Sequence, residues 1–125
     1  MNINIKTTNI SLKTETEDYL TKKLLTLKKL VDFEADNVFA QVELGKTTNH
    51  HKSGNIFMAE INLRVGKTTF RAVSKKEDLH AAIDDMKDEI SRELKSKFDK
   101  QRSMERKGGA AIKNMVRGMR QNKRS

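Results

Sequence analysis

Residues 74–100 read SKKEDLHAAIDDMKDEISRELKSKFDK, and the predicted fold is built around this stretch. Its apolar side chains recur every three or four positions, which is the spacing that lines one face of an α-helix. They are Leu79, Ile83, Met86, Ile90 and Leu94. Ser74 and Glu77 have the spacing of a capping box, so we expect the helix to begin there. The stretch therefore predicts one long amphipathic helix with a buried stripe, running to Lys100.

Charge is ordered along this predicted helix. Its first half is acidic, with Glu77, Asp78, Asp84, Asp85, Asp88 and Glu89, whereas its second half is basic, with Arg92, Lys95, Lys97 and Lys100. Each sign lies near the end of the helix dipole that favours it. This order is typical of a solvated helix, but it also suits a binding surface limited to the basic half, and both interpretations stay open.

The rest of the chain shows one more helical pattern and four strand patterns. Thr14 and Glu17 repeat the capping-box spacing, and a helical apolar stripe follows them to about Asp32. Alternation of apolar and polar residues predicts strands over residues 1–6, 37–44, 56–65 and 68–73. Gly66 and Lys67 suit a two-residue type II′ turn between the last two strands. The polar residues 45–55 indicate a loop.

These elements follow the order β-α-β-β-β-α, which indicates an α+β fold. We expect a four-stranded sheet with two parallel helices on one face, because the first β-α-β crossover is right-handed and the next strands pair as a meander. Parallel helices would bring their C-terminal ends together near the Gly66–Lys67 turn. Six lysines would then cluster at one end of the domain: Lys28, Lys29, Lys67, Lys95, Lys97 and Lys100.

Length and charge suggest a single domain with a polyanionic partner. The 125 residues predict one folded domain over residues 1–101 and a basic flexible tail over residues 102–125. The chain has 26 Lys and Arg against 17 Asp and Glu, and residues 99–125 hold 9 of the bases and 2 of the acids. Such a density favours nucleic acid or an anionic membrane surface. Nucleic acid is the expected partner because the tail lacks a large apolar face.

Several other functions find no support in the sequence. The chain has no cysteine, and neither an apolar leader nor a membrane-spanning stretch is visible, so we expect a soluble cytoplasmic protein. His50, His51 and His80 are poorly spaced for tetrahedral zinc. No Ser-His-Asp set, P-loop or glycine-rich phosphate motif accompanies the many acids. We therefore predict no enzyme activity, no cofactor and no metal.

Two short runs carry a resemblance to a known family. EDLHAAID, residues 77–84, and RELK, residues 92–95, resemble the signature of the ribosome hibernation-promoting factors, also called ribosome-associated inhibitors or sigma-54 modulation proteins. The resemblance spans residues 1 to about 100 and is to the short form of the family. It implies a domain similar to a double-stranded-RNA-binding domain, monomeric on its own, that sits in the decoding channel of the small ribosomal subunit. There it overlaps the mRNA and tRNA positions and inhibits translation in starvation or stationary phase.

The resemblance also implies which residues contact rRNA. Carried over by position, the expected contacts are Lys23, Arg92 and Lys95, since cations on a rigid helix pair with phosphates. On charge and placement we add Lys22, Lys28, Lys29, Lys75, Lys76, Lys97 and Lys100. Tail contacts with mRNA, rRNA or ribosomal proteins would come from Arg102, Arg106, Lys107, Lys113, Arg117, Arg120, Lys123 and Arg124.

The sequence also departs from the family pattern, and alternatives remain. His80 stands where the family usually has tyrosine, and we expect it to be a surface histidine. Thr26 and Glu89 occupy places that are often lysine. A general structured-RNA-binding or RNA-chaperone module would be equally basic, and the family's older name implies a protein-interaction modulator of transcription. Tyr19 and five phenylalanines, mostly in core or strand positions, leave few platforms for stacking single-stranded bases.

Overall fold

The structure, a computed structural model, describes residues 2–48 and 55–105. Its elements are β1 (Ile3–Thr8), α1 (Thr14–Leu25), β2 (Val38–Thr48), β3 (Asn55–Val65), β4 (Thr68–Lys76) and α2 (Leu79–Glu105). The predicted β-α-β-β-β-α order and the α+β class are therefore confirmed. Among the described helices, none is long and apolar enough to cross a membrane.

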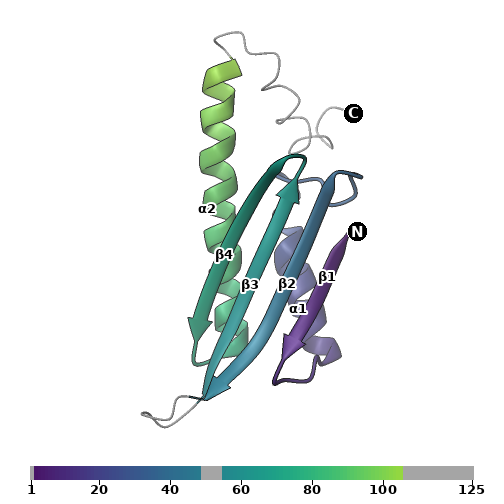
Figure 1. The fold of residues 1–125 in the computed structure, drawn as a ribbon, viewed down its shortest axis with the longest axis vertical. Helices are drawn as coiled ribbons and strands as arrows, with labels where there is room; N and C mark the ends of the chain where they lie inside the picture. The colour runs from purple at the N-terminus through teal and green to yellow at the C-terminus, as the bar shows by residue number, and fades with distance from the viewer. Residues whose placement is uncertain (1, 49–54, 106–125) are drawn as a thin grey trace.

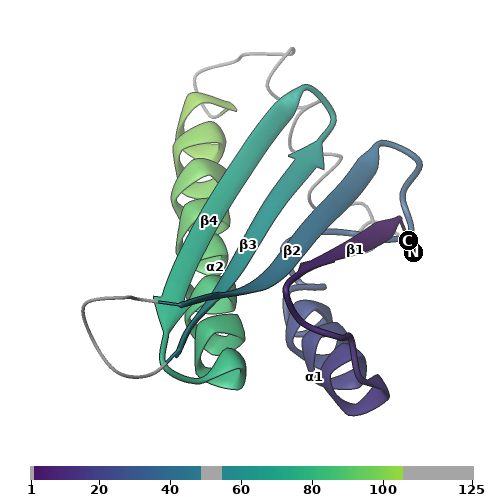
Figure 2. The ribbon, with the colours of Figure 1, turned by 60° about the horizontal axis from the view of Figure 1, so that its bottom comes forward.

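The four strands form one mixed sheet in the order β1-β2-β3-β4 (Figure 1). β1 runs parallel to β2 because α1 carries the chain back between them. The other neighbouring pairs are antiparallel. Both helices lie behind the sheet in Figure 1, so the described elements leave the front face open, and Figure 2 shows the same arrangement from below.

The core lies between the sheet and the helices, as the sequence pattern predicts. Ala59, Ile61, Leu63 and Val65 of β3 are buried, and so are Ile83, Met86, Ile90 and Leu94 of α2. Each of these α2 side chains is 0% exposed. Burying such side chains is the main favourable contribution to folding, so the helical stripe fixes which face of α2 packs on the sheet.

The β3–β4 turn also follows the prediction. Val65 pairs with Thr68, which leaves Gly66 and Lys67 as the two turn residues. Gly66 has a φ of 63°. The φ of Lys67 is not positive, because Asn9 is the only described non-glycine residue with a positive φ. A positive φ at the first central residue alone is the geometry of a type II′ turn.

The predicted start of the long helix is wrong. Ser74 lies in β4, where it pairs with Ala59 of β3 and is 4% exposed. The first turn of α2 is capped instead by Asp78, whose Oδ2 accepts a hydrogen bond of 2.9 Å from the N–H of Ala81. Strand pairing extends β4 to Lys76, so the capping-box spacing at Ser74 is coincidental.

The first helix differs at both ends. Its N-cap is Lys13, with no capping hydrogen bond from a side chain, so the predicted capping box at Thr14 does not form. The helix ends at Leu25 rather than near Asp32. The chain continues in turns in which Leu27 and Val31 remain buried. Successive turns keep nearly the same burial period as a helix, which is why the apolar stripe extends beyond the helix in the sequence.

Three strands and α2 end later in the sequence than predicted. β1 continues past Lys6 to Thr8, and β4 past residue 73 to Lys76. β2 continues through Gly45 to Thr48, so part of the predicted loop is strand, and residues 49–54 lie outside the described residues. These ends pair with a neighbouring strand despite their polar composition. α2 runs past Lys100 to Glu105, across the expected start of the tail.

The helices are parallel, but their C-terminal ends do not lie together as predicted. Tyr19 contacts His80, and Lys23 contacts Asp84, so both helices advance in the same direction. This register places the end of α1 at Leu25 level with about residue 86 of α2. The end of α2 at Glu105 lies about 28 Å further along its axis, and Figure 1 shows α2 extending well past α1.

Candidate nucleic-acid interface

Four side chains join the two helices, and we call them the inter-helix seam: Tyr19 and Lys23 of α1 with His80 and Asp84 of α2. The Tyr19 and His80 rings stack with centroids 4.2 Å apart and planes at 6°. The Tyr19 hydroxyl donates a hydrogen bond of 2.6 Å to Asp84 Oδ1. Lys23 Nζ lies 3.1 Å from the same oxygen and 5.3 Å from the Tyr19 ring centroid.

The seam forms because both pairs have the same spacing. Residues four apart on a helix lie above one another on one face, so Tyr19 and Lys23 meet His80 and Asp84 in register. His80 lies partly exposed at the surface, as expected, but its ring stacks on Tyr19, a contact that the sequence did not predict. Sequence reasoning missed Tyr19 and Asp84 as partners of Lys23, because contacts between helices have no local sequence signal.

The seam shifts three pKa values in the direction that strengthens it. The hydrogen bond with Asp84 raises the pKa of Tyr19, and that of Lys23 is raised by its own contact with Asp84. Partial burial opposes ionisation of Asp84, but contacts from Tyr19 and Lys23 outweigh it and hold the Asp84 pKa below its ordinary value. The ion pair with Asp84 therefore keeps the Lys23 ammonium group beside α2.

Arg92 and Lys95 lie beyond the seam on the same helix. Both side chains are exposed. At 100° per residue, both lie on the solvent side of α2 and toward the flank that carries Asp84. Lys95 follows Asp84 by 11 positions, about 16 Å along the axis. Within the described part of the chain, neither cation makes an ion pair. The three cations expected from the resemblance therefore share one side of the helix layer.

The remaining predicted cations are spread around this surface. Lys22 is exposed on α1, and Lys28 and Lys29 are exposed in the turns that follow it. Lys97 and Lys100 border a hollow of about 340 Å³ with Thr68, Thr69 and Phe70, so they lie on the β4 side of α2. They are thus separated by the helix from Arg92 and Lys95, although they lie near the Lys67 turn as predicted.

Two more of the predicted rRNA contacts, Lys75 and Lys76, are exposed at the end of β4. They lie next to the start of α2 and not near its basic end. Arg102 is in α2, but its side chain lies outside the described part. The other tail cations, from Arg106 to Arg124, lie outside it altogether.

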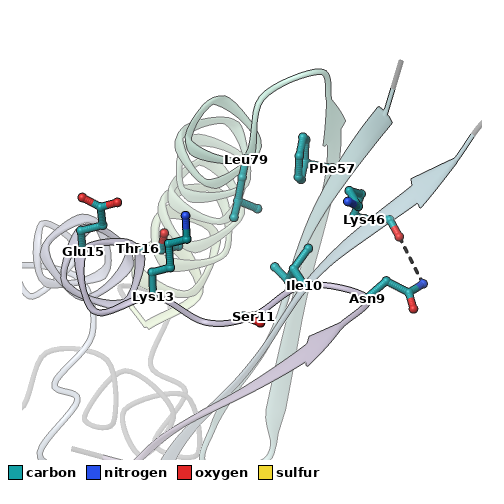
Figure 3. Close-up of a pocket in the computed structure, with 9 residues that line it drawn as sticks. All are labelled: Asn9, Ile10, Ser11, Lys13, Glu15, Thr16, Lys46, Phe57 and Leu79. Carbon is teal, nitrogen blue, oxygen red and sulfur yellow. Dashed lines mark hydrogen bonds between the residues drawn. The ribbon is translucent and has the colours of Figure 1, made fainter. Parts of the chain in front are cut away.

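A separate cleft of about 770 Å³ opens where both helices begin (Figure 3). Ile10, Phe57 and Leu79 supply apolar walls, while Lys13 and Lys46 contribute cations. The Asn9 side-chain amide donates a hydrogen bond of 3.3 Å to the Lys46 carbonyl. The cleft is lined by neither histidine nor cysteine, and it lies at the end of the domain away from Lys95.

Metal binding finds no site in the described residues, where no three His, Cys, Asp or Glu side chains converge on a point. His50 and His51 lie outside those residues. His80 is stacked on Tyr19.

Comparison with known proteins assigns a family. A family model described as sigma 54 modulation protein / S30EA ribosomal protein matches residues 3–102. The structure of the Thermus thermophilus Protein Y N-terminal domain is 28% identical, with a TM-score of 0.61 over 77% of this chain and 98% of that one. A ribosomal subunit interface protein from Coxiella burnetii shares the fold, with 14% identity and a TM-score of 0.56 over 77% of this chain and 96% of its own. None of the curated proteins matches. Because the family match covers most of the sequence, the chain belongs to the sigma 54 modulation protein / S30EA ribosomal protein family.

Proposed function

We propose that this protein binds the decoding channel of the small ribosomal subunit, overlaps the mRNA and tRNA positions there, and inhibits translation in starvation or stationary phase. The chain belongs to a family whose description names a ribosomal protein, and this membership supports a ribosome-associated role. The observation that carries the proposal is the surface formed by Lys23, Arg92 and Lys95. In this role the protein acts in the cytoplasm as a binding protein, without catalysis.

The surface suits the phosphate backbone of folded RNA. Arg92 and Lys95 project from a helix whose opposite face is fully buried, so their backbone is rigid. Lys23 is held by Asp84. Cations on rigid elements position a protein on RNA through phosphates rather than bases. The acids Asp84 and Asp88 end the basic surface on the side of the start of α2. RNA phosphates should therefore contact only the part of α2 that follows these acids.

Charge reversal tests the proposal. The double variant Arg92→Glu with Lys95→Glu should no longer cosediment with purified small subunits, because two attractive contacts become repulsive. Both side chains are exposed, so the fold should be retained, and circular dichroism checks this. The matched control is Lys6→Glu with Lys13→Glu, two exposed lysines on β1 and at the start of α1, which changes the net charge equally. Unchanged cosedimentation of the first variant would reject the proposal.

General structured-RNA binding is the alternative that this experiment must separate. Folded RNA such as tRNA should compete only weakly with small subunits if the channel is the specific site. Equal affinity for both would instead favour a general RNA-binding or chaperone module. A protein-interaction modulator of transcription predicts weak salt dependence, whereas binding through this many phosphates weakens steeply as salt rises.

A further inference from the structure

One phenylalanine lies on the open face of the sheet rather than in the core. Phe39 of β2 is 47% exposed, whereas Phe33, Phe70 and Phe98 are at most 7% exposed. Its neighbours Val38 and Ala40 point into the core, so strand alternation directs the Phe39 ring away from the helices. Among the described residues, only Leu25 is another large exposed apolar side chain.

Polar side chains surround this ring on both sides. A hollow of about 410 Å³ is lined by Phe39 with Gln41, Asn62, Arg64 and Thr69. A second hollow, of about 250 Å³, lies toward β1 and is lined by Phe39 with Asn2, Ile3, Asn4, Ala40 and Gln41. Neither lining contains a carboxylate. Arg64 is the direct cross-strand partner of Phe39, which places a cation beside the ring.

The carboxylates of the same sheet face are held by their own partners. Arg71 Nε lies 2.6 Å from Glu60 Oε2. The Thr8 hydroxyl donates a hydrogen bond of 2.8 Å to Glu43 Oε2. Arg64 Nε donates to the Gly66 carbonyl at 3.1 Å, so Arg64 leans toward the β3–β4 turn and not toward Glu60. The area around Phe39 therefore combines an aromatic face, neutral amides and one cation.

We propose that the open face of the sheet binds an unpaired RNA nucleotide, whose base stacks on Phe39. The Gln41 amide can donate to and accept from base edges. The Asn62 amide donates to Glu60 Oε2 at 3.5 Å, and its carbonyl oxygen can accept from a base edge. Arg64 can pair with the adjacent phosphate. Aromatic side chains on the open face of a four-stranded sheet are a recurrent way to stack unpaired bases. A protein partner fits less well, because the ring is surrounded by polar side chains rather than by a continuous apolar patch.

This site goes beyond the proposed ribosome contact. It lies on the face of the sheet opposite the helices (Figure 1), and therefore opposite Lys23, Arg92 and Lys95. Stacking of an unpaired base needs neither the small subunit nor a folded RNA. The two proposals can consequently fail separately.

A tryptophan probe tests the site directly. The sequence has no tryptophan, so Phe39→Trp introduces a single indole fluorophore at the proposed stacking position. Titration of the full chain with a single-stranded oligouridylate of about ten nucleotides should quench its emission through stacking. Phe39→Ala should weaken oligouridylate binding by about tenfold relative to the unchanged chain. Leu25→Ala, the matched exposed apolar change, should leave the affinity unchanged.

Two results would overturn the proposal. One is unquenched indole emission from the Phe39→Trp variant under conditions in which the chain binds the oligonucleotide, together with equal affinity of Phe39→Ala. The other is loss of self-association in Phe39→Ala, seen by sedimentation, with unchanged RNA binding, which would assign the ring to an interface between copies. Since cosedimentation with small subunits is measured separately, neither result would bear on the helical surface.

Discussion

Asp84 is the residue on which the geometry of the seam depends. One Asp84 carboxylate oxygen accepts the hydrogen bond of the Tyr19 hydroxyl and forms the ion pair with the Lys23 ammonium group. The His80 ring stacks on Tyr19 beside them. The carboxylate is 43% exposed, so its contribution to stability is modest and screened by solvent. Its larger effect is on the position of Lys23, a cation that we propose as an RNA contact.

Asp84→Asn should therefore lower the affinity for small subunits clearly, while it lowers the free energy of unfolding only slightly. The Asp84 pKa is lowered in the folded state, so its stabilisation is present above the unfolded value of about 3.9 and is lost as pH falls through the folded pKa. Urea unfolding should show a small deficit for Asp84→Asn at neutral pH that disappears in acid. A deficit that grows on acidification would contradict this assignment.

The start of α2 provides a second test at single residues. Asp78→Ala removes the observed cap and should lower the free energy of unfolding by about 1 kcal/mol. Ser74→Ala should change it by less than about 0.5 kcal/mol, because the buried Ser74 hydroxyl has no hydrogen-bond partner among the described residues. Chemical denaturation of both variants measures the difference. A larger loss for Ser74→Ala would mean that Ser74 is the cap after all.

At the scale of elements, burial periodicity predicted well and element ends did not. The α2 stripe and the alternation in β3 determine which side chains enter the core, and each is visible locally. The end of α1 and the extension of β2 depend on packing and on a partner strand, which the local sequence does not contain. The opposite sides of α2 that Lys95 and Lys97 take follow from 100° per residue, but the place of Lys97 in the hollow beside Thr68 and Phe70 depends on how α2 packs on β4, which the local sequence does not contain.

The two faces of α2 should respond differently to substitution. Ile90→Ala removes a side chain that is 0% exposed and should cost about 2–5 kcal/mol of stability. Arg92→Ala, two positions further along the same helix, should change stability by less than about 0.5 kcal/mol yet weaken small-subunit binding. Denaturation and cosedimentation of the same two proteins test the pair of expectations. Equal stability losses would show that Arg92 has a structural role.

In the whole molecule, the basic tail adds positive charge to that of the folded domain, and both should contribute to binding the small subunit. Residues 108–125 contain Lys113, Arg117, Arg120, Lys123 and Arg124 and no acid. Truncation after Lys107 should leave unfolding unchanged, weaken binding to small subunits and make the dependence of affinity on salt less steep, because fewer counterions are released. Cosedimentation over a salt series measures all of this. Unaltered affinity and salt dependence would exclude a role for the tail in binding.

Competition on purified small subunits tests whether the protein occupies the decoding channel. The wild-type protein should reduce binding of both mRNA and initiator tRNA as it saturates the subunit. The Lys6→Glu, Lys13→Glu control should do the same, whereas Arg92→Glu, Lys95→Glu should leave both ligands bound. If the wild-type protein saturates the subunit while mRNA and initiator tRNA stay bound at full occupancy, the protein does not bind in the decoding channel.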